Sequence, residues 1–205
     1  MSVEKSLRSF EDAVNFHGHV CPGLAMGYRV AETALRLLEV DRPHDEELVA
    51  IVENDTCAVD AVQVVTGCTF GKGNLIFNDF GKGVFSFIAR DKGKGIRISY
   101  RKLPSLPESE QARLGELQKK IRSGGTATKD EREEYDKLRQ GLIHSILVCP
   151  PEEILDWRSL EEEPPRTARI RPSIVCERCG EQVMETRIVD VDGRKLCIPC
   201  SNETG

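Results

Sequence analysis

The sequence predicts an α+β protein that ends in a small cysteine-rich domain. Over residues 1–163, segments with apolar residues at helical spacing alternate with short apolar runs that are typical of buried strands. Over residues 164–205, two Cys-x-x-Cys pairs occur in a segment that is too short to bury a large core. We therefore expect two domains, 1–163 and 164–205, the second of which needs a metal or disulfides for its stability.

The composition is that of a folded protein without a strongly basic character. Hydrophobic residues make up 39% and charged residues 31%, and the net charge is −5, so nucleic acid is not an expected partner. The first residues lack a signal peptide's apolar core, and no apolar run approaches the roughly 20 residues that cross a bilayer. We expect a cytoplasmic protein without a membrane partner, whose eight cysteines point to metal or redox chemistry before disulfides.

Helices predominate in the first part of the predicted core. Residues 1–16 and 24–39 carry apolar residues at three- and four-residue spacing, which predicts two amphipathic helices. A buried strand is expected over 48–53. A short apolar helix is expected over 57–66, with Gly67 in the position that commonly ends a helix.

Three further strands are expected over 75–80, 84–90 and 95–100. Glycine-rich turns at 81–83 and 91–95 separate them, so consecutive strands are expected to pair as hairpins. The segment 84–90 has few polar positions, which predicts that it is central in the sheet.

Charged helices are expected over 107–123 and 129–148, on either side of a turn at Gly124-Gly125. They form either a solvated hairpin or an arm for dimerisation. A short helix is expected over 152–160, and the acidic, proline-containing segment 161–165 is expected to be a linker.

The tail contains two cysteine pairs, Cys176-x-x-Cys179 and Cys197-x-x-Cys200, with 17 residues between them. This spacing lies within the range of four-cysteine zinc sites. A hairpin at the turn signal Asp192-Gly193 would return the second pair to the first. Four thiolates then complete a tetrahedron without an open position, which is typical of structural zinc. The alternatives are two disulfides or free thiols.

A second group of potential ligands lies near the N-terminus. His17, His19 and Cys21 alternate along the chain, so their side chains can face one point if the segment is extended. Cys21 precedes one predicted helix and Cys57 begins another, where the helix dipole favours a thiolate. Two imidazoles with one or two thiolates can hold zinc or iron, and we expect Cys21, Cys57 and His19 to be catalytic. The alternative is packed cysteines and turn histidines.

The glycine-rich stretch 66–74 contains Cys68 and Lys72. Its backbone N–H groups could hold an anion, which would make Cys68 and Lys72 cofactor-binding residues. The alternatives are a connector with turn glycines and a packed Cys68, and the sequence leaves both open.

Two regions of the chain carry longer motifs. They are Phe16-His17-Gly18-His19-Val20-Cys21-Pro22-Gly23-Leu24-Ala25-Met26-Gly27 and Asp55-Thr56-Cys57-Ala58-Val59-Asp60-Ala61-Val62-Gln63, the latter followed by Thr66-Gly67-Cys68-Thr69 and Gly71-Lys72-Gly73-Asn74-Leu75. Together they resemble the signature of the FmdE family of formylmethanofuran dehydrogenase proteins. The resemblance covers roughly residues 10–160.

This resemblance implies a thioredoxin-like α+β core with a mixed sheet flanked by helices, a treble-clef-type zinc finger and a homodimer. It implies a metal-containing active site at His17, His19, Cys21 and Cys57, with Cys68 nearby. The family takes its name from genes that accompany a molybdenum or tungsten formylmethanofuran dehydrogenase, an anaerobic one-carbon enzyme. Subunits of such an oxidoreductase are therefore expected partners.

Three functions are compatible with these observations. The first is metal-dependent chemistry on a small anionic or one-carbon substrate, with zinc or iron in the core and structural zinc in the tail. The second is an accessory protein that carries or inserts a metal or cofactor for a molybdenum or tungsten enzyme. The third is a binding module in which the zinc finger contacts a protein or nucleic acid.

Overall fold

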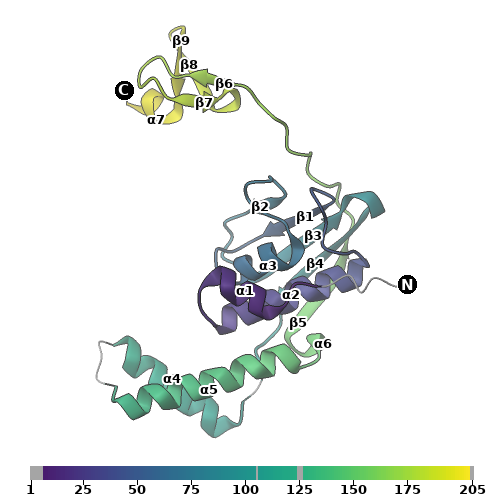
Figure 1. The fold of residues 1–205 in the computed structure, drawn as a ribbon, viewed down its shortest axis with the longest axis vertical. Coiled ribbons are helices and arrows are strands. Elements are labelled where there is room, and N and C mark those ends of the chain that lie inside the picture. The colour runs from purple at the N-terminus through teal and green to yellow at the C-terminus, as the bar shows by residue number, and fades with distance from the viewer. Residues whose placement is uncertain (1–6, 105, 124–126, 204–205) are drawn as a thin grey trace. The chain divides into compact units, whose positions relative to one another are not determined.

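The chain divides into two compact units, Met1–Thr167 and Ala168–Gly205 (Figure 1). The computed structural model describes residues 7–104, 106–123 and 127–203. The first unit contains a five-stranded mixed sheet flanked by helices, and the second contains two small two-stranded sheets and a short helix. The predicted α+β class is confirmed.

The core sheet has the strand order β2-β1-β3-β4-β5. β1 (Leu48–Val52) pairs parallel with β2 (Leu75–Phe77) and antiparallel with β3 (Val84–Ala89). β4 (Lys94–Tyr100) pairs antiparallel with both β3 and β5 (Leu155–Leu160). β3 is therefore the central strand, as its low polar content predicts.

Two predictions for this sheet are wrong. The segments 75–80 and 84–90 do not form a hairpin, because β1 lies between β2 and β3 and pairs with both. The segment 152–160 is helical only within α6 (Pro151–Ile154) and then continues as β5, whose two ends are buried. In both cases, pairing with a strand that is distant in the sequence outweighs the local signal.

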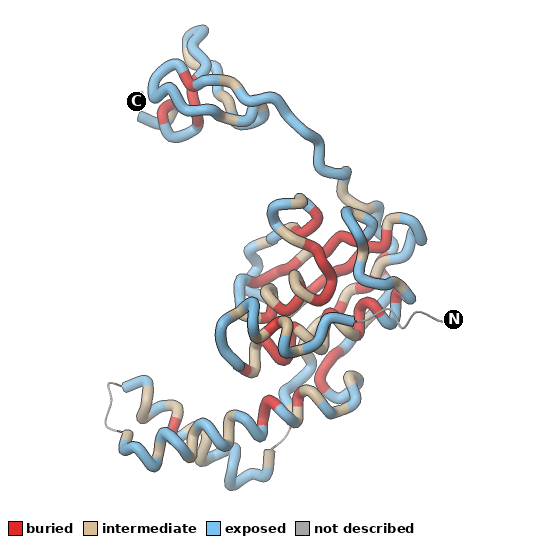
Figure 2. Tube along the Cα trace, in the orientation of Figure 1, coloured by how far each residue is buried: buried red, intermediate tan, exposed pale blue. Residues whose placement is uncertain are grey.

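Three helices lie over one face of the sheet (Figure 1). They are α1 (Phe10–His17), α2 (Pro22–Leu38) and α3 (Ala58–Thr66). The first helix begins later than predicted, because Ser9 and Asp12 form a reciprocal capping box directly before it. Figure 2 shows that buried residues concentrate in the sheet and in α2 and α3, where the main hydrophobic core lies.

α2 and α3 approach each other most closely at Gly27. A Cβ atom on Gly27 would lie 2.2 Å from the carbonyl oxygen of Ala58 and 2.5 Å from its Cα. Because only glycine has no Cβ, only glycine allows the two backbones to come this close. The contact places the start of α3 beside the first turns of α2.

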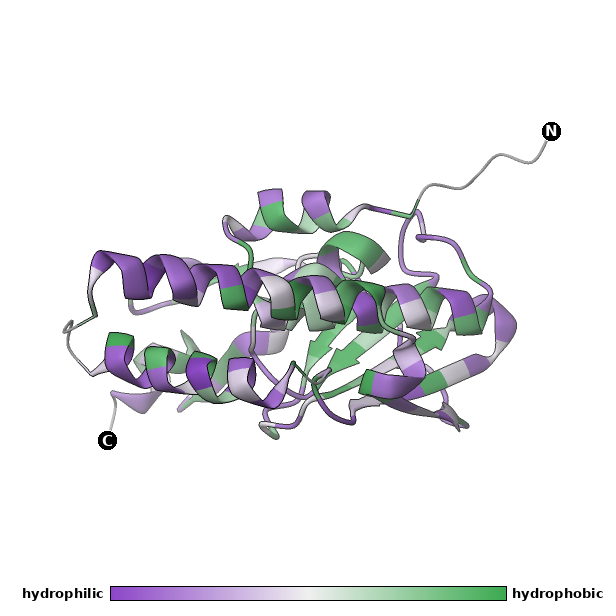
Figure 3. Cartoon of the chain, turned by 90° about the horizontal axis from the view of Figure 1, so that it is seen from below, coloured by the Kyte–Doolittle hydropathy of each residue, from purple (hydrophilic) through white to green (hydrophobic). Residues whose placement is uncertain are grey.

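α4 (Glu108–Arg122) and α5 (Lys129–Val148) form the predicted helical hairpin, which is largely hydrophilic outside its contacts with the core (Figure 3). α5 packs against α2 through its C-terminal half, which buries Leu142, Ile143 and Ile146. The predicted turn at Gly124-Gly125 and the start of the predicted first helix over 1–6 lie outside the described residues. None of the described helices combines the length and apolar composition needed to cross a bilayer.

The second unit is built from two hairpins. β6 (Ser173–Val175) pairs with β7 (Gln182–Met184), and β8 (Ile188–Val191) pairs with β9 (Arg194–Cys197). α7 (Ile198–Asn202) follows β9 directly. The turn between β8 and β9 has positive φ angles at both central residues, 53° and 81°, which confirms the predicted hairpin turn.

Candidate metal centres

The four tail cysteines converge in the second unit. The sulfur atoms of Cys176, Cys179, Cys197 and Cys200 all lie within 4.8 Å of one another. Three of the four cysteines are buried, and they form most of the small apolar core of this unit together with Leu196. The potential metal ligands therefore make up most of the buried side chains of this unit. Because few other buried apolar residues stabilise it, we expect its folding to depend on metal binding.

Backbone donors favour the thiolate form of one ligand of this site, Cys176. Gly180 adopts a φ of 76° and donates to the carbonyl of Cys176 at 2.9 Å, which closes the first Cys-x-x-Cys turn. Backbone N–H groups of Cys179, Cys197 and Arg178 point at the Cys176 sulfur and lower the pKa of Cys176 to about 6. The arrangement matches a closed four-thiolate zinc site.

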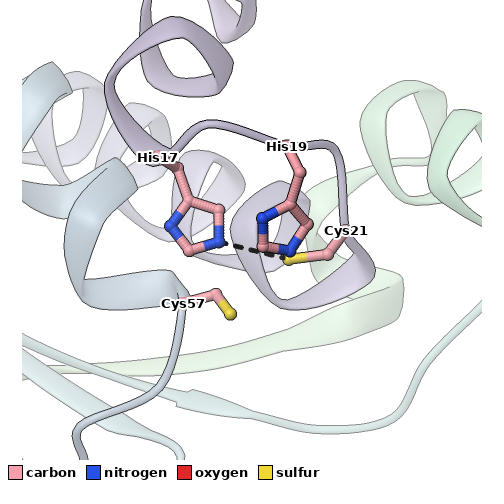
Figure 4. Close-up of side chains that lie close together, drawn as sticks. All are labelled: His17, His19, Cys21 and Cys57. Atoms are coloured by element: carbon pink, nitrogen blue, oxygen red, sulfur yellow. Dashed lines mark hydrogen bonds between the residues drawn. The ribbon is translucent and has the colours of Figure 1, made fainter.

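A second cluster forms in the core unit from His17, His19, Cys21 and Cys57. One ligand atom of each residue lies within 4.8 Å of the others. Figure 4 shows the His17 imidazole extending from the end of α1 and the His19 imidazole from the loop that follows, with Cys21 at the start of α2 and Cys57 facing them from the start of α3. Nε2 of His17 lies 4.0 Å from the Cys21 sulfur. The structure therefore brings together residues that are up to 40 positions apart in the sequence.

Local backbone signals place the first three side chains. Gly18 takes a left-handed conformation, with a φ of 89°, and ends α1 directly after His17. Cys21 is the N-cap of α2, and its sulfur accepts a hydrogen bond from the Leu24 N–H at 3.3 Å. Pro22 occupies the first turn of α2, where its missing N–H is not needed. The His17–Cys21 segment is thereby held between two helix ends.

Cys57 reaches the cluster through an ordered turn after β1. The buried Asn54 donates to the carbonyl of Lys82 at 2.8 Å and accepts hydrogen bonds from both the N–H and the hydroxyl of Thr56. This turn makes Cys57 the N-cap residue of α3. Burial, and then the neighbouring Cys21, raise the pKa of Cys57, so the isolated side chain favours the thiol until a cation displaces its proton.

Asp60 is a site residue that sequence reasoning missed. Its Oδ2 lies 2.7 Å from Nδ1 of His17, and its other oxygen accepts from Nε2 of Gln63 at 3.5 Å. The carboxylate therefore fixes the proton on Nδ1 and leaves the Nε2 lone pair free for a cation. The available signal is the three-residue spacing between Cys57 and Asp60, which puts them one helical turn apart.

Two further predicted site residues lie outside this cluster. Cys68 is fully buried, donates from its sulfur to the carbonyl of Leu48, and has its pKa raised to about 11 by burial. Lys72 donates from Nζ to the carbonyl of Asp45 at 3.1 Å. These contacts are those of a packed thiol and an anchored loop, and they do not support the cofactor-binding role predicted for Cys68 and Lys72.

Comparison with known proteins assigns the core unit to a protein family. The family model described as "FmdE, Molybdenum formylmethanofuran dehydrogenase operon" matches residues 16–156. The chain belongs to this FmdE family. The resemblance predicted from the two motifs is thereby confirmed. The model described as "Prokaryotic dksA/traR C4-type zinc finger" matches residues 169–203 and covers the four-cysteine cluster.

Two similar proteins extend this comparison. A crystal structure of an FmdE-like protein from Syntrophus aciditrophicus, named after a tungsten formylmethanofuran dehydrogenase, aligns with a TM-score of 0.57 and 26% identity, over 95% of this chain and 90% of that one. A "Probable S-adenosyl-L-methionine-binding protein" of Archaeoglobus fulgidus is 32% identical over 193 residues. That alignment covers 92% of this chain and 51% of the relative, so the chain spans about half of that protein's length.

We call the unit Met1–Thr167 the FmdE core after its family. Its four potential ligands suit a transition-metal ion. Two imidazole nitrogens and two sulfurs are ligands that zinc and iron accept. Ligand atoms around a tetrahedral zinc ion lie roughly 3.3–3.8 Å apart, as follows from zinc–ligand bonds of roughly 2.0–2.3 Å. The 4.0 Å between His17 Nε2 and the Cys21 sulfur is close to that range. The other pairs of ligand atoms lie within 4.8 Å, so side-chain movements that shorten these distances would complete a coordination sphere.

Replacing Asp60 by Asn should weaken metal binding at the FmdE core by about 10–100-fold, because the amide carries no charge to orient and polarise His17. Competition with a chromophoric chelator measures this affinity. Asp55→Asn is the matched control, since Asp55 is exposed, lies in the turn before α3 and is outside the cluster. Equal affinities for Asp60→Asn and Asp55→Asn would show that the carboxylate contact has no role in metal binding.

Proposed function

We propose that the FmdE core is a metal-dependent centre that acts on a small anionic or one-carbon substrate. His17, His19, Cys21 and Cys57 would hold the ion, which is zinc or iron. The observation that carries this proposal is the convergence of the four ligand atoms within 4.8 Å, with Asp60 bonded to the far nitrogen of His17. A carboxylate behind a histidine is the arrangement that supports metal-bound imidazoles in proteins.

The four ligands differ in ways that suit separate roles. When bound, the metal would supply Lewis-acid or redox chemistry. Cys21 is buried and bonded to a backbone N–H, so it is a fixed anchor. His19 is exposed, and it is the ligand whose place a substrate atom or water could take with the least rearrangement. A position that can open in this way distinguishes a catalytic site from the closed site in the tail.

Elemental analysis of anaerobically purified protein tests this proposal. We expect two metal ions per wild-type chain, one for each cluster. The Cys21→Ser chain should retain only one, because serine is a poor ligand for zinc or iron at this position. Cys149→Ser is the matched control, since Cys149 lies at the end of α5, bonds through its sulfur to the carbonyl of Ile146, and belongs to neither cluster.

Two outcomes would count against a metal centre in the core. One is a single ion per wild-type chain after purification with excess zinc and iron. The other is an unchanged ion count in Cys21→Ser. If Cys21→Ser or Cys57→Ser still converts a small anionic or one-carbon substrate as fast as the wild type, the cluster is not catalytic. That result would not count against metal binding.

The exposure of His19 also favours a second candidate function, in which the core carries a metal for another enzyme. The names of the family and of the Syntrophus structure refer to molybdenum and tungsten formylmethanofuran dehydrogenase, and we propose such an oxidoreductase as the acceptor. A carrier should release its core metal to an acceptor protein within minutes, whereas an enzyme should retain it through many turnovers. Transfer of a radioactive metal isotope to a purified acceptor separates the two functions.

A further inference from the structure

A tyrosine lies at the sheet edge that leads to the core cluster. Tyr100 is the last residue of β4, and it shares a face of the sheet with Ile98 and Ile96, which point into the helix-covered core. β1 and β4 both pair antiparallel with β3, so they run in the same direction and end at the same edge. This is the edge from which the chain leaves β1 and continues to Cys57.

The direction of α2 brings Cys21 to the same edge. Leu38, at the end of α2, lines a surface hollow together with Gly95 and Ile96, near the start of β4. α2 packs along β4, so its first turn lies toward the opposite end of that strand, where Tyr100 is. The phenol thus lies on the helix side of the sheet, at the end where Cys21 and Cys57 both lie.

The Tyr100 hydroxyl is buried and has no hydrogen-bond partner among the described residues. Its ring is held in place by Phe85, with ring centroids 5.6 Å apart, and by Gly83, where a Cβ atom would lie 2.4 Å from the tyrosine ring. Buried hydroxyls in folded proteins nearly always have a partner, and one without a protein partner is expected to have another role. Here the packing fixes a donor without giving it an acceptor.

Electrostatics link this hydroxyl to the cluster. Burial raises the pKa of Tyr100, and a negative charge on Cys57, when its thiol is ionised, raises it further. The phenol is therefore neutral near pH 7 and can donate a hydrogen bond. No sulfur or nitrogen of the cluster is a hydrogen-bond partner of the phenol, so its donor remains free.

We propose that the Tyr100 hydroxyl donates a hydrogen bond to a small carboxylate bound at the His17–His19–Cys21–Cys57 cluster. The inference rests on the proposed function, since it requires that the cluster binds a metal with one exchangeable position. It assigns a specificity role: ligands with an accepting oxygen gain a bond that apolar ligands of the same size cannot form. A buried donor without a partner should discriminate strongly between such ligands.

The test is anion binding to the full chain loaded with Co²⁺, with formate as the probe. Formate bound at the core changes the visible absorption of Co²⁺ there, while the four-thiolate site has no open position and does not respond. Tyr100→Phe should weaken formate binding by about tenfold or more, since one hydrogen bond to a charged acceptor is lost. Tyr135→Phe, the same change on α5, is the matched control and should bind formate like the wild type.

Two accompanying measurements separate this role from a structural one. The Co²⁺ content of Tyr100→Phe should equal that of the wild type. Its thermal midpoint should stay the same or rise, because the change removes a buried hydroxyl that has no protein partner. A clear loss of metal or of stability in Tyr100→Phe would overturn the inference, since the hydroxyl would then support the fold or the cluster.

The remaining outcomes distinguish this inference from the proposed function. A core that takes up no Co²⁺ refutes the metal centre, and the inference falls with it. A loaded core whose spectrum does not respond to formate refutes the inference alone. Equal formate affinities in the wild type and in Tyr100→Phe do the same.

Discussion

Removing metal with a strong chelator is expected to unfold the C-terminal unit over residues 173–200 and to leave the core unit folded. The buried residues of this unit are mainly its cysteines, so the metal supplies most of what holds it together. Metal binding of this kind contributes on the order of 10 kcal/mol or more to folding. Hydrogen exchange resolved by segment should show rapid exchange in β6 to β9 and unchanged protection in β1, β3 and β4.

A variant that lacks one of the four sulfur ligands is the control for this experiment. Cys179→Ser should produce the same loss of protection in the tail without chelator, because it removes one of four ligands. Adding zinc back should restore protection in the wild type only. Tail amides that remain protected in excess chelator would refute the account of this unit as metal-dependent.

Replacing Gly27 by Ala is expected to destabilise the core unit and to disrupt its metal site. The new Cβ would meet the backbone of Ala58 at 2.2 Å, and backbone atoms cannot rotate away as a side chain can. Overpacking of this kind costs about 1–3 kcal/mol. Moving α3 away from α2 also moves Cys57 away from Cys21, so core metal affinity should fall together with stability.

Gly141→Ala is the matched control for this substitution. Gly141 lies within α5, and a Cβ atom there would meet nothing within 4 Å. The same change should therefore stabilise the protein by about 0.5–1 kcal/mol, because alanine favours helix more than glycine does. Denaturant titration measures both variants. If Gly27→Ala is as stable as Gly141→Ala, the close approach of α2 and α3 does not govern the position of Cys57.

The elements that could be predicted from the sequence are those with strong local signals. The helical hairpin of α4 and α5 and the turn at Asp192-Gly193 depend on helical spacing and on turn residues that are close together in the chain. The position of β1 between β2 and β3 could not be predicted, because it depends on which distant strands pair. The sequence predicts a helix in place of β5 for the same reason, since its partner β4 lies more than 50 residues away.

In the candidate site, too, the residues with a local sequence signal could be predicted, and those that depend on contacts between distant residues could not. The alternation of His17, His19 and Cys21 and the placement of Cys57 at a helix start indicate which residues meet. The roles of Asp60 and Tyr100 could not be predicted in this way, because a single carboxylate or phenol is common on any helix or strand. Asp60 is singled out only by its contact with Nδ1 of His17 in the folded chain. Tyr100 is singled out only because its buried hydroxyl has no hydrogen-bond partner among the described residues.

Anomalous diffraction from crystals of the full chain, recorded at the zinc and iron absorption edges, tests the central claim most directly. We expect two peaks, one among the four tail sulfurs and one bounded by His17, His19, Cys21 and Cys57. A single peak in the tail, from crystals grown with excess zinc and iron and with the Cys21 and Cys57 sulfurs turned away from each other, would contradict it.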